Sequence, residues 1–169
     1  MIIEYVKLRD NAHSPQRSHP SDVGLDVFYS PPDTSDPDDS KNDIQLYRLH
    51  SALVPTGLRF DIPHGYMLEV KNRSSVASKR SLVVGACVID PGYDGEVFID
   101  IHNIGRDKQT IRAGDKIAQL VMIPVVHFRP MQIPIEATYG REPIAMSRRG
   151  EQGFGSTDDF YGPPKDIQI

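Results

Sequence analysis

Short apolar or alternating runs, separated by glycines, prolines and polar turns, occupy most of this chain. Such runs, bounded by turn residues, are typical of β-strands of about 4–8 residues. In the run at 96–103 the side chains alternate, with Val97, Ile99 and Ile101 on one face and Phe98, Asp100 and His102 on the other. We predict strands within residues 2–8, 25–29, 44–50, 52–60, 66–71, 81–90, 96–103 and 116–126. Many short strands of this kind indicate an all-β barrel or sandwich.

Helical periodicity is confined to one short stretch, SSVASKR at residues 74–80, where a serine can cap the helix start. Residues 31–43, PPDTSDPDDSKND, are acidic, rich in proline and nearly free of apolar side chains. They predict an exposed loop insert that could contact a protein partner. We predict a single β-domain over residues 1–147, followed by a flexible strap and tail over residues 148–169.

Composition narrows the class of protein. A length of 169 residues suits one domain with a sizeable core, and the net charge of −4 gives no global basic field for nucleic acid. Cys87 is the one cysteine of the chain, which excludes an internal disulfide and favours a reducing compartment. The N-terminus MIIEYVKLRD has no signal-peptide apolar region, and no apolar run approaches the ~20 residues that span a bilayer. We therefore expect a cytoplasmic, intracellular protein without a membrane partner, located in the host cytoplasm if the chain is viral.

Two segments carry polar residues that a purely structural strand does not need. Asp26 lies among apolar residues in DVGLDVF at 22–28, so it needs a partner or a cation if it is buried; an exposed strand residue is the alternative. Arg73, Ser74 and Ser75 precede the expected helix start, where a guanidinium and hydroxyls suit phosphate. A serine in front of a helix is more often only a cap.

Three further segments complete the set of candidates. GACVIDPGYDGEV at 85–97 predicts a β-hairpin with Asp90 at the end of its first strand and Tyr93 at its tip. An Asp beside a Tyr can bind a sugar hydroxyl or hold a water as general base. Gln119 is the polar exception in AGDKIAQLV at 113–121, and RRGEQGFGSTDDF at 148–160 has the composition of a flexible strap that stacks on a flat group and grips an anion.

The order and spacing of these segments resemble the five motifs of the trimeric dUTPase family. The motifs stand here as DVGLDVF, NRSSVA, GACVIDPGYDGEV, GDKIAQLV and RGEQGFGSTD, and LVPTGLRFDIPHGYMLEV resembles the family's stretch between the first two. The resemblance covers nearly the whole chain except the 31–43 insert and the last ten residues. It implies a homotrimer of jelly-roll-like β-barrels of the dUTPase-like, or β-clip, class, with each active site between subunits.

The resemblance also implies a role for each motif residue. Asp90 would order the water that attacks the α-phosphate, act as general base and contact the 3′-hydroxyl, while Tyr93 packs under the deoxyribose. The backbone over residues 85–89 would read uracil, and Asp26 would lie near the hydration shell of Mg²⁺. The remaining substrate-binding residues implied are Arg73, Ser74, Ser75, Gly85, Val88, Ile89, Gln119, Arg149, Phe154, Gly155, Ser156 and Thr157, with Phe154 stacked on the base. The reaction would be hydrolysis of dUTP to dUMP and pyrophosphate.

Several positions depart from the family pattern. Cys87 and Ser75 stand where glycine is usual, and Asp94 replaces a usual Arg or Gln. Asp100 stands where the related dCTP deaminases carry their catalytic glutamate, but these lack the GFGST strap and have an arginine where this chain has Ser78. A dCTP deaminase, a pyrophosphatase for dCTP or a modified dUTP, and a regulatory binding protein on this scaffold are the alternatives.

Overall fold

The computed structural model describes residues 1–32 and 42–137. Short strands account for most of the regular structure, and α1 (Ser74–Arg80) is the one α-helix in these two ranges. The strands are β1 (Glu4–Lys7), β2 (Leu25–Phe28), β3 (Ile44–Leu46), β4 (Ser51–Pro55), β5 (Leu58–Asp61), β6 (Tyr66–Lys71), β7 (Leu82–Val84), β8 (Val88–Ile89), β9 (Phe98–Asn103), β10 (Gln109–Ile111) and β11 (Lys116–Pro124), and a 3-10 turn, η2, covers Ile135–Ala137.

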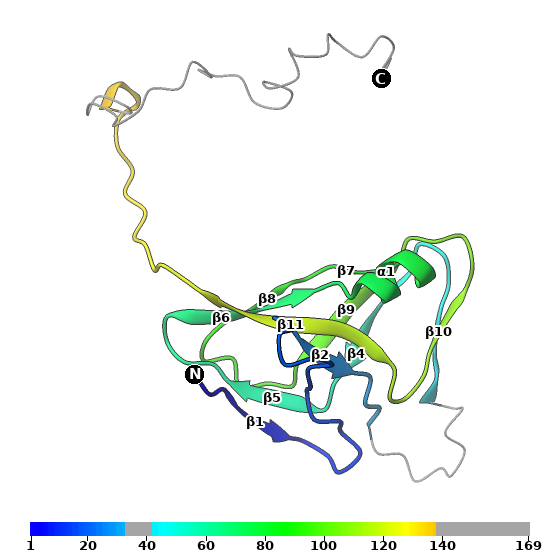
Figure 1. Cartoon of the computed structure of the whole chain (residues 1–169). Helices are drawn as coiled ribbons and strands as arrows, with labels where there is room; N and C mark the ends of the chain where they lie inside the picture. Colours follow the sequence, from blue (N-terminus) through cyan, green and yellow to red (C-terminus); the bar gives the residue numbers. More distant parts are fainter. Residues whose placement is uncertain (33–41, 138–169) are drawn as a thin grey trace, which may run out of the picture. The chain divides into compact units, whose positions relative to one another are not determined.

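The strands form four antiparallel sheets. The largest has the order β2-β11-β6-β8, the next is β4-β9-β7, and two pairs are formed by β1 with β5 and by β10 with β3. Figure 1 shows β11, the longest strand, crossing the body of the domain with β2 and β6 as neighbours. This arrangement confirms the predicted all-β, jelly-roll-like fold.

A continuous apolar core lies between these sheets. Its fully buried side chains come from nearly every strand and include Val27, Val54, Leu58, Leu68, Leu82, Ile99, Ile101, Ile111 and Leu120. Strand β9 follows the predicted alternation, because Val97, Ile99 and Ile101 are buried while Phe98 is exposed. Burial of one face of each strand is the main stabilising contribution, at about 25 cal/mol per Å² of apolar surface.

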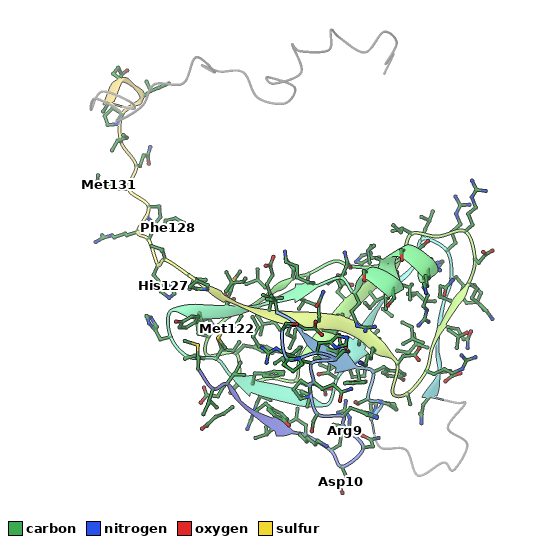
Figure 2. All side chains as sticks on the ribbon, in the orientation of Figure 1. Arg9, Asp10, Met122, His127, Phe128 and Met131 are labelled. Carbon is green, nitrogen blue, oxygen red and sulfur yellow. The ribbon has the colours of Figure 1, made fainter. Side chains whose placement is uncertain are left out.

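An ion pair inside the domain joins the loop after β1 to the segment before β9. Arg9 lies in this loop and Asp10 next to it is exposed at the surface (Figure 2). The Arg9 guanidinium donates to Glu96 at 3.0 Å and to the Ser30 carbonyl at 2.8 Å, while Glu96 also accepts the Gly57 N–H at 2.8 Å. These bonds fix the β4–β5 turn and the end of the segment that carries Tyr93.

The predicted helix is confirmed, but its predicted serine cap is wrong. Arg73 is the N-cap residue and makes no capping side-chain hydrogen bond, and Ser74 and Ser75 form the first turn rather than preceding it. The helix ends at Arg80, and the C-cap residue Ser81 has a left-handed backbone (φ 53°) and donates its N–H to the Ala77 carbonyl. The Arg73 side chain cannot cap the helix, because a guanidinium offers no acceptor to the free N–H groups of the first turn; it is bound elsewhere, as described below.

Residue contacts divide the chain into two units, Met1–His127 and Phe128–Ile169. The predicted boundary at 147/148 lies outside the described residues and stays a prediction, as do the strap and most of the 31–43 insert. Among the helices of residues 1–32 and 42–137, none is long and apolar enough to cross a membrane.

Candidate active site

Asp26 lies at the centre of a cluster of charges on β2. The Arg73 Nε donates to its Oδ1 at 2.7 Å, and the Lys116 Nζ lies 2.9 Å from its Oδ2. Ser18 adds a longer hydrogen bond to Oδ2, at 3.4 Å. Asp26 itself is only 8% exposed. The prediction that a buried Asp26 needs a partner is therefore confirmed, with two cations rather than one.

These partners control the ionisation of Asp26. Burial of the carboxyl pushes its pKa upward, but the hydrogen bonds and positive charges of Lys116 and Arg73 together outweigh this effect. The pKa of Asp26 consequently lies below its ordinary value of 3.8, and the group is a carboxylate at neutral pH.

A polar cleft of about 340 Å³ opens over this cluster. Four further predicted or neighbouring groups reach it: Ser74 and Ser75 from the first turn of α1, Gln119 from β11, and Asp22 from the loop before β2. Gly24 also lines the cleft, and a Cβ at this position would lie 2.3 Å from the Gln119 Oε1, so glycine is required for Gln119 to enter. The cleft therefore combines cationic, hydroxyl and amide donors, the groups that bind phosphate oxygens.

The donor set of this cleft fits Mg²⁺ only through water. Both oxygens of Asp26 already accept from cationic side chains, which leaves little room for direct coordination of a metal ion. Over residues 1–32 and 42–137, no three His, Cys, Asp or Glu side chains are grouped to hold a metal ion. Mg²⁺ usually keeps several waters and is held by one or two carboxylates together with substrate phosphates, so the two acids of the cleft, Asp22 and Asp26, suit that role.

Asp90 and Tyr93 occupy the two ends of a tight turn. The Tyr93 N–H donates to the Asp90 carbonyl at 3.3 Å, with Pro91 and Gly92 between them. Gly92 has φ +86°, which a type II turn requires at its third position, and proline suits the second. The Tyr93 hydroxyl donates to the Glu96 carbonyl at 2.8 Å. Asp90 and Tyr93 are both exposed, so substrate can reach both side chains.

The predicted hairpin pairs differently from the expectation. Its first arm, β8, pairs with β6, with Leu68 opposite Ile89 and Glu69 opposite Val88. The second arm leads into β9, which pairs with β7 and β4. The two arms separate because the pairing of β7 with β9 ends at Val84, and β8 then pairs with the side of β6 that β11 does not occupy.

The loop at residues 85–87 is attached to the cleft through Asn72. The Asn72 side chain accepts the Val84 N–H at 2.7 Å, and its carbonyl accepts from the Gln119 side chain at 2.9 Å. The Cys87 carbonyl accepts the Val70 N–H at 2.7 Å, and the Cys87 side chain is half-buried. One asparagine thus connects the predicted base-reading backbone with the predicted phosphate-binding cleft.

The turn that carries Tyr93 borders a different hollow. This hollow of about 680 Å³ is lined by Gly92, Tyr93 and Asp94 together with residues of β1 and β5, and by none of the cleft residues. The predicted site residues of one chain are therefore distributed over two surfaces of the described domain.

Sequence reasoning found most of the cleft but missed two residues that support it, Lys116 and Asn72. Both are within motifs quoted from the sequence, GDKIAQLV and NRSSVA, but nothing in the sequence shows that they contact Asp26 and Gln119. Arg149, Phe154, Gly155, Ser156 and Thr157 lie outside the described residues, and their predicted roles stay predictions.

Comparison with known proteins identifies the family to which the chain belongs. The family model for dUTPase matches residues 10–158, nearly the whole chain. The chain belongs to the dUTPase family. A deoxyuridine 5′-triphosphate nucleotidohydrolase of Solibacter usitatus is 34% identical over 145 residues, which cover 84% of this chain and 92% of that protein. The dUTPase-family chain is also 33% identical to the fowl adenovirus A enzyme of the same name, over 90% of this chain and 75% of that protein.

A solved structure agrees with this assignment. The dUTPase of Staphylococcus bacteriophage 80alpha, solved as a variant with dUpNHpp, matches with a TM-score of 0.71 and 26% identity, over 92% of this chain and 98% of that one. The β-sheets described here are therefore those of a dUTPase fold, in agreement with the family resemblance read from the five motifs.

Proposed function

We propose that this protein hydrolyses dUTP to dUMP and pyrophosphate. The observation that carries the proposal is the cleft, which brings Asp26 together with Arg73, Ser74, Ser75 and Gln119, from three separate motifs, in a chain that matches the dUTPase family model. The 80alpha relative was solved with dUpNHpp, a nucleotide of the same base and sugar. These facts support a deoxyuridine triphosphate as the substrate.

In the proposed mechanism, the cleft binds the triphosphate and the turn at 90–93 binds the sugar. Arg73 and Lys116 neutralise part of the phosphate charge, and the amide of Gln119 and the hydroxyls of Ser74 and Ser75 donate to phosphate oxygens. Asp90 holds a water against the α-phosphorus and removes its proton as the water attacks. The bond between the α-phosphorus and the bridging oxygen then breaks, and pyrophosphate leaves.

Binding of phosphate requires a rearrangement of charges, because Arg73 and Lys116 are both bound to Asp26 in the free protein. Mg²⁺, bound through water near Asp26, would supply further neutralisation of the triphosphate. Arg73 can then exchange its carboxylate partner for a phosphate at small cost, since both are anionic acceptors with similar geometry.

We infer that the active enzyme is a homotrimer. The cleft around Asp26 and the hollow beside Tyr93 have no lining residue in common. Because the family resemblance also implies a site shared between subunits, we infer that the cleft of one subunit faces the turn at 90–93 of another. The strap residues Arg149, Phe154, Gly155, Ser156 and Thr157 would close the site over the base and the γ-phosphate, as the family resemblance implies.

A substrate panel tests the proposed function. Purified protein is incubated with Mg²⁺ and dUTP, dCTP, dTTP or UTP, and nucleotide, pyrophosphate and ammonia are resolved. We expect dUMP and pyrophosphate from dUTP, and Asp90→Asn should reduce turnover by roughly 10²-fold or more because the amide cannot accept a proton. The matched control is Asp94→Asn on the same turn, which should keep most of the activity. Release of ammonia from dCTP would instead indicate a deaminase, and near-native turnover by Asp90→Asn would show that another group is the base.

A further inference from the structure

The outward face of β9 carries an acid and a histidine that the proposed mechanism does not use. Asp100 and His102 are two residues apart on this strand, so both project from the side opposite the buried Ile99 and Ile101. The His102 Nε2 lies 3.0 Å from the Asp100 Oδ2. An ionised carboxylate can only accept, so in this pair the His102 ring nitrogen carries the hydrogen and donates it.

This pair lies directly against the backbone of the loop at 85–87. The Gly85 N–H donates to the Asp100 carbonyl at 2.9 Å, and the Ala86 N–H donates to the Asp100 Oδ2 at 3.2 Å. A Cβ on Gly85 would lie 2.3 Å from the Asp100 Oδ2 and 2.4 Å from the His102 Nε2. The absence of a side chain at Gly85 is what allows the loop backbone to contact the pair so closely.

The same loop is fixed from its other side by uncharged groups. Asn72 accepts the Val84 N–H, and Val70 donates to the Cys87 carbonyl. Between these two attachments, the Asp100 carbonyl accepts from Gly85 and the Asp100 side chain accepts from Ala86. Its hydrogen bond from His102 keeps the pKa of Asp100 below its ordinary value, with burial opposing this effect and the Ala86 N–H adding to it. A charged acceptor of this kind holds a backbone N–H more strongly than a neutral one.

We propose that Asp100 and His102 are positioning residues that hold the backbone of residues 85–87 in the conformation that selects the base of the nucleotide. The inference rests on the proposed function, because the loop is the segment to which that function assigns reading of uracil. Asp100 acts on the loop through its bond to Ala86, and His102 acts by fixing the Asp100 carboxylate. Neither side chain takes part in the phosphate chemistry.

The test compares truncating and conservative variants at both positions. Asp100→Ala and His102→Ala remove the contacts, whereas Asp100→Asn keeps an oxygen for the Ala86 N–H and His102→Gln keeps a donor at the position of Nε2. Asp107→Asn, an exposed carboxylate between β9 and β10, is the control. For each variant, kcat and KM are measured with dUTP and dCTP, and amide hydrogen exchange is measured for residues 85–87.

We expect Asp100→Ala to lower the preference for dUTP over dCTP by about tenfold, the equivalent of one hydrogen bond to a charged group. The loss should fall mainly on KM, exchange at Ala86 should accelerate, and Asp100→Asn and His102→Gln should restore most of the preference.

A merely structural role would lower thermal stability and affect both substrates equally. An unchanged preference, or unchanged exchange at Ala86, would overturn the inference. Failure of the wild-type protein to hydrolyse any nucleotide would instead contradict the proposed function, and the exchange rates would still decide whether Asp100 holds the loop.

Discussion

At the residue scale, the sequence predicts that Asp26 needs a charged partner but does not identify that partner. An acid inside an apolar strand predicts a charged partner, because an unpaired buried carboxylate is costly. The partners themselves come from β11 and from the residue before α1, which are far away in sequence. Arg73 was predictable as a phosphate ligand from its motif, but its bond to Asp26 follows only from the pairing of β11 with both β2 and β6, the strand that leads to Arg73.

The charge cluster predicts how stability depends on pH. Because the pKa of Asp26 is lower in the folded protein than its ordinary value of 3.8, the folded state binds fewer protons there than the unfolded chain. The contribution of Asp26 to stability is therefore fully present above pH 3.8 and is lost as the pH falls through the lower, folded-state pKa.

Asp26→Asn should destabilise the protein at neutral pH by about 1–3 kcal/mol. This is less than for a fully buried pair, because the Arg73 and Lys116 side chains keep 22% and 29% exposure to water. Thermal unfolding of both proteins at equal concentration, from pH about 7 down to about 3, measures the difference. The difference should shrink at the acid end, and a difference that grows there would contradict the assigned partners.

At the scale of elements, the apolar pattern located most strands but not their ends. The run at 52–60 contains both β4 and β5, because Gly57 with φ +69° forms a turn inside it. The run at 81–90 likewise contains β7 and β8, separated by the loop that Asp100 holds. Strand β10, with the short sequence QTI, was missed because three residues give no periodicity, and its pairing with β3 is what orders it.

The turn between β4 and β5 requires glycine at position 57, and the cost of replacing it can be measured. An alanine at Gly57 would need a left-handed backbone and would place its Cβ 2.6 Å from the Cβ of the buried Ala12. We expect Gly57→Ala to lower the free energy of unfolding by about 2–4 kcal/mol, from backbone strain and overpacking together.

Gly65→Ala is the matched control for this substitution. Gly65 has a similar φ of +88°, but a Cβ there meets no atom within 4 Å. Gly65→Ala should therefore cost only the backbone strain, about 1–2 kcal/mol. Denaturant unfolding of both variants at one protein concentration makes the comparison, and equal losses would show that contact with Ala12 carries no penalty.

At the scale of the whole molecule, the sequence predicts an assembly of subunits, which the structure of a single chain does not display. The five motifs imply an active site shared between subunits, and the described domain has its candidate residues on two surfaces. How the subunits assemble could not be derived from hydrophobic pattern, because exposed apolar side chains lie on several strands, among them Val6 in β1, Leu53 in β4 and Phe98 in β9. The predicted strap at residues 148–169 lies outside the described residues, and its role stays a prediction.

Trimers assembled from two different inactive variants test whether each active site is shared between subunits. Arg73→Ala and Asp90→Asn each remove one part of the proposed site and should be nearly inactive alone. If the parts come from different subunits, unfolding the two variants together and refolding them should return about a quarter of wild-type activity, because random assembly pairs two intact surfaces at about that frequency. Light scattering should give a mass three times the 18.9 kDa chain. Mixtures that stay inactive, although trimeric, would indicate that each site is built from one chain.

The proposed function depends on attack of water on the α-phosphorus of dUTP, and hydrolysis in water enriched in heavy oxygen (¹⁸O) identifies the attacked atom. Mass spectrometry of the two products shows which phosphorus received the oxygen of the attacking water. We expect one heavy oxygen atom in dUMP and none in pyrophosphate, with the rate of labelling reduced by roughly 10²-fold or more in Asp90→Asn. Label found in pyrophosphate would contradict the assignment of the attacked phosphorus, and a failure to form dUMP at all would contradict the proposed function.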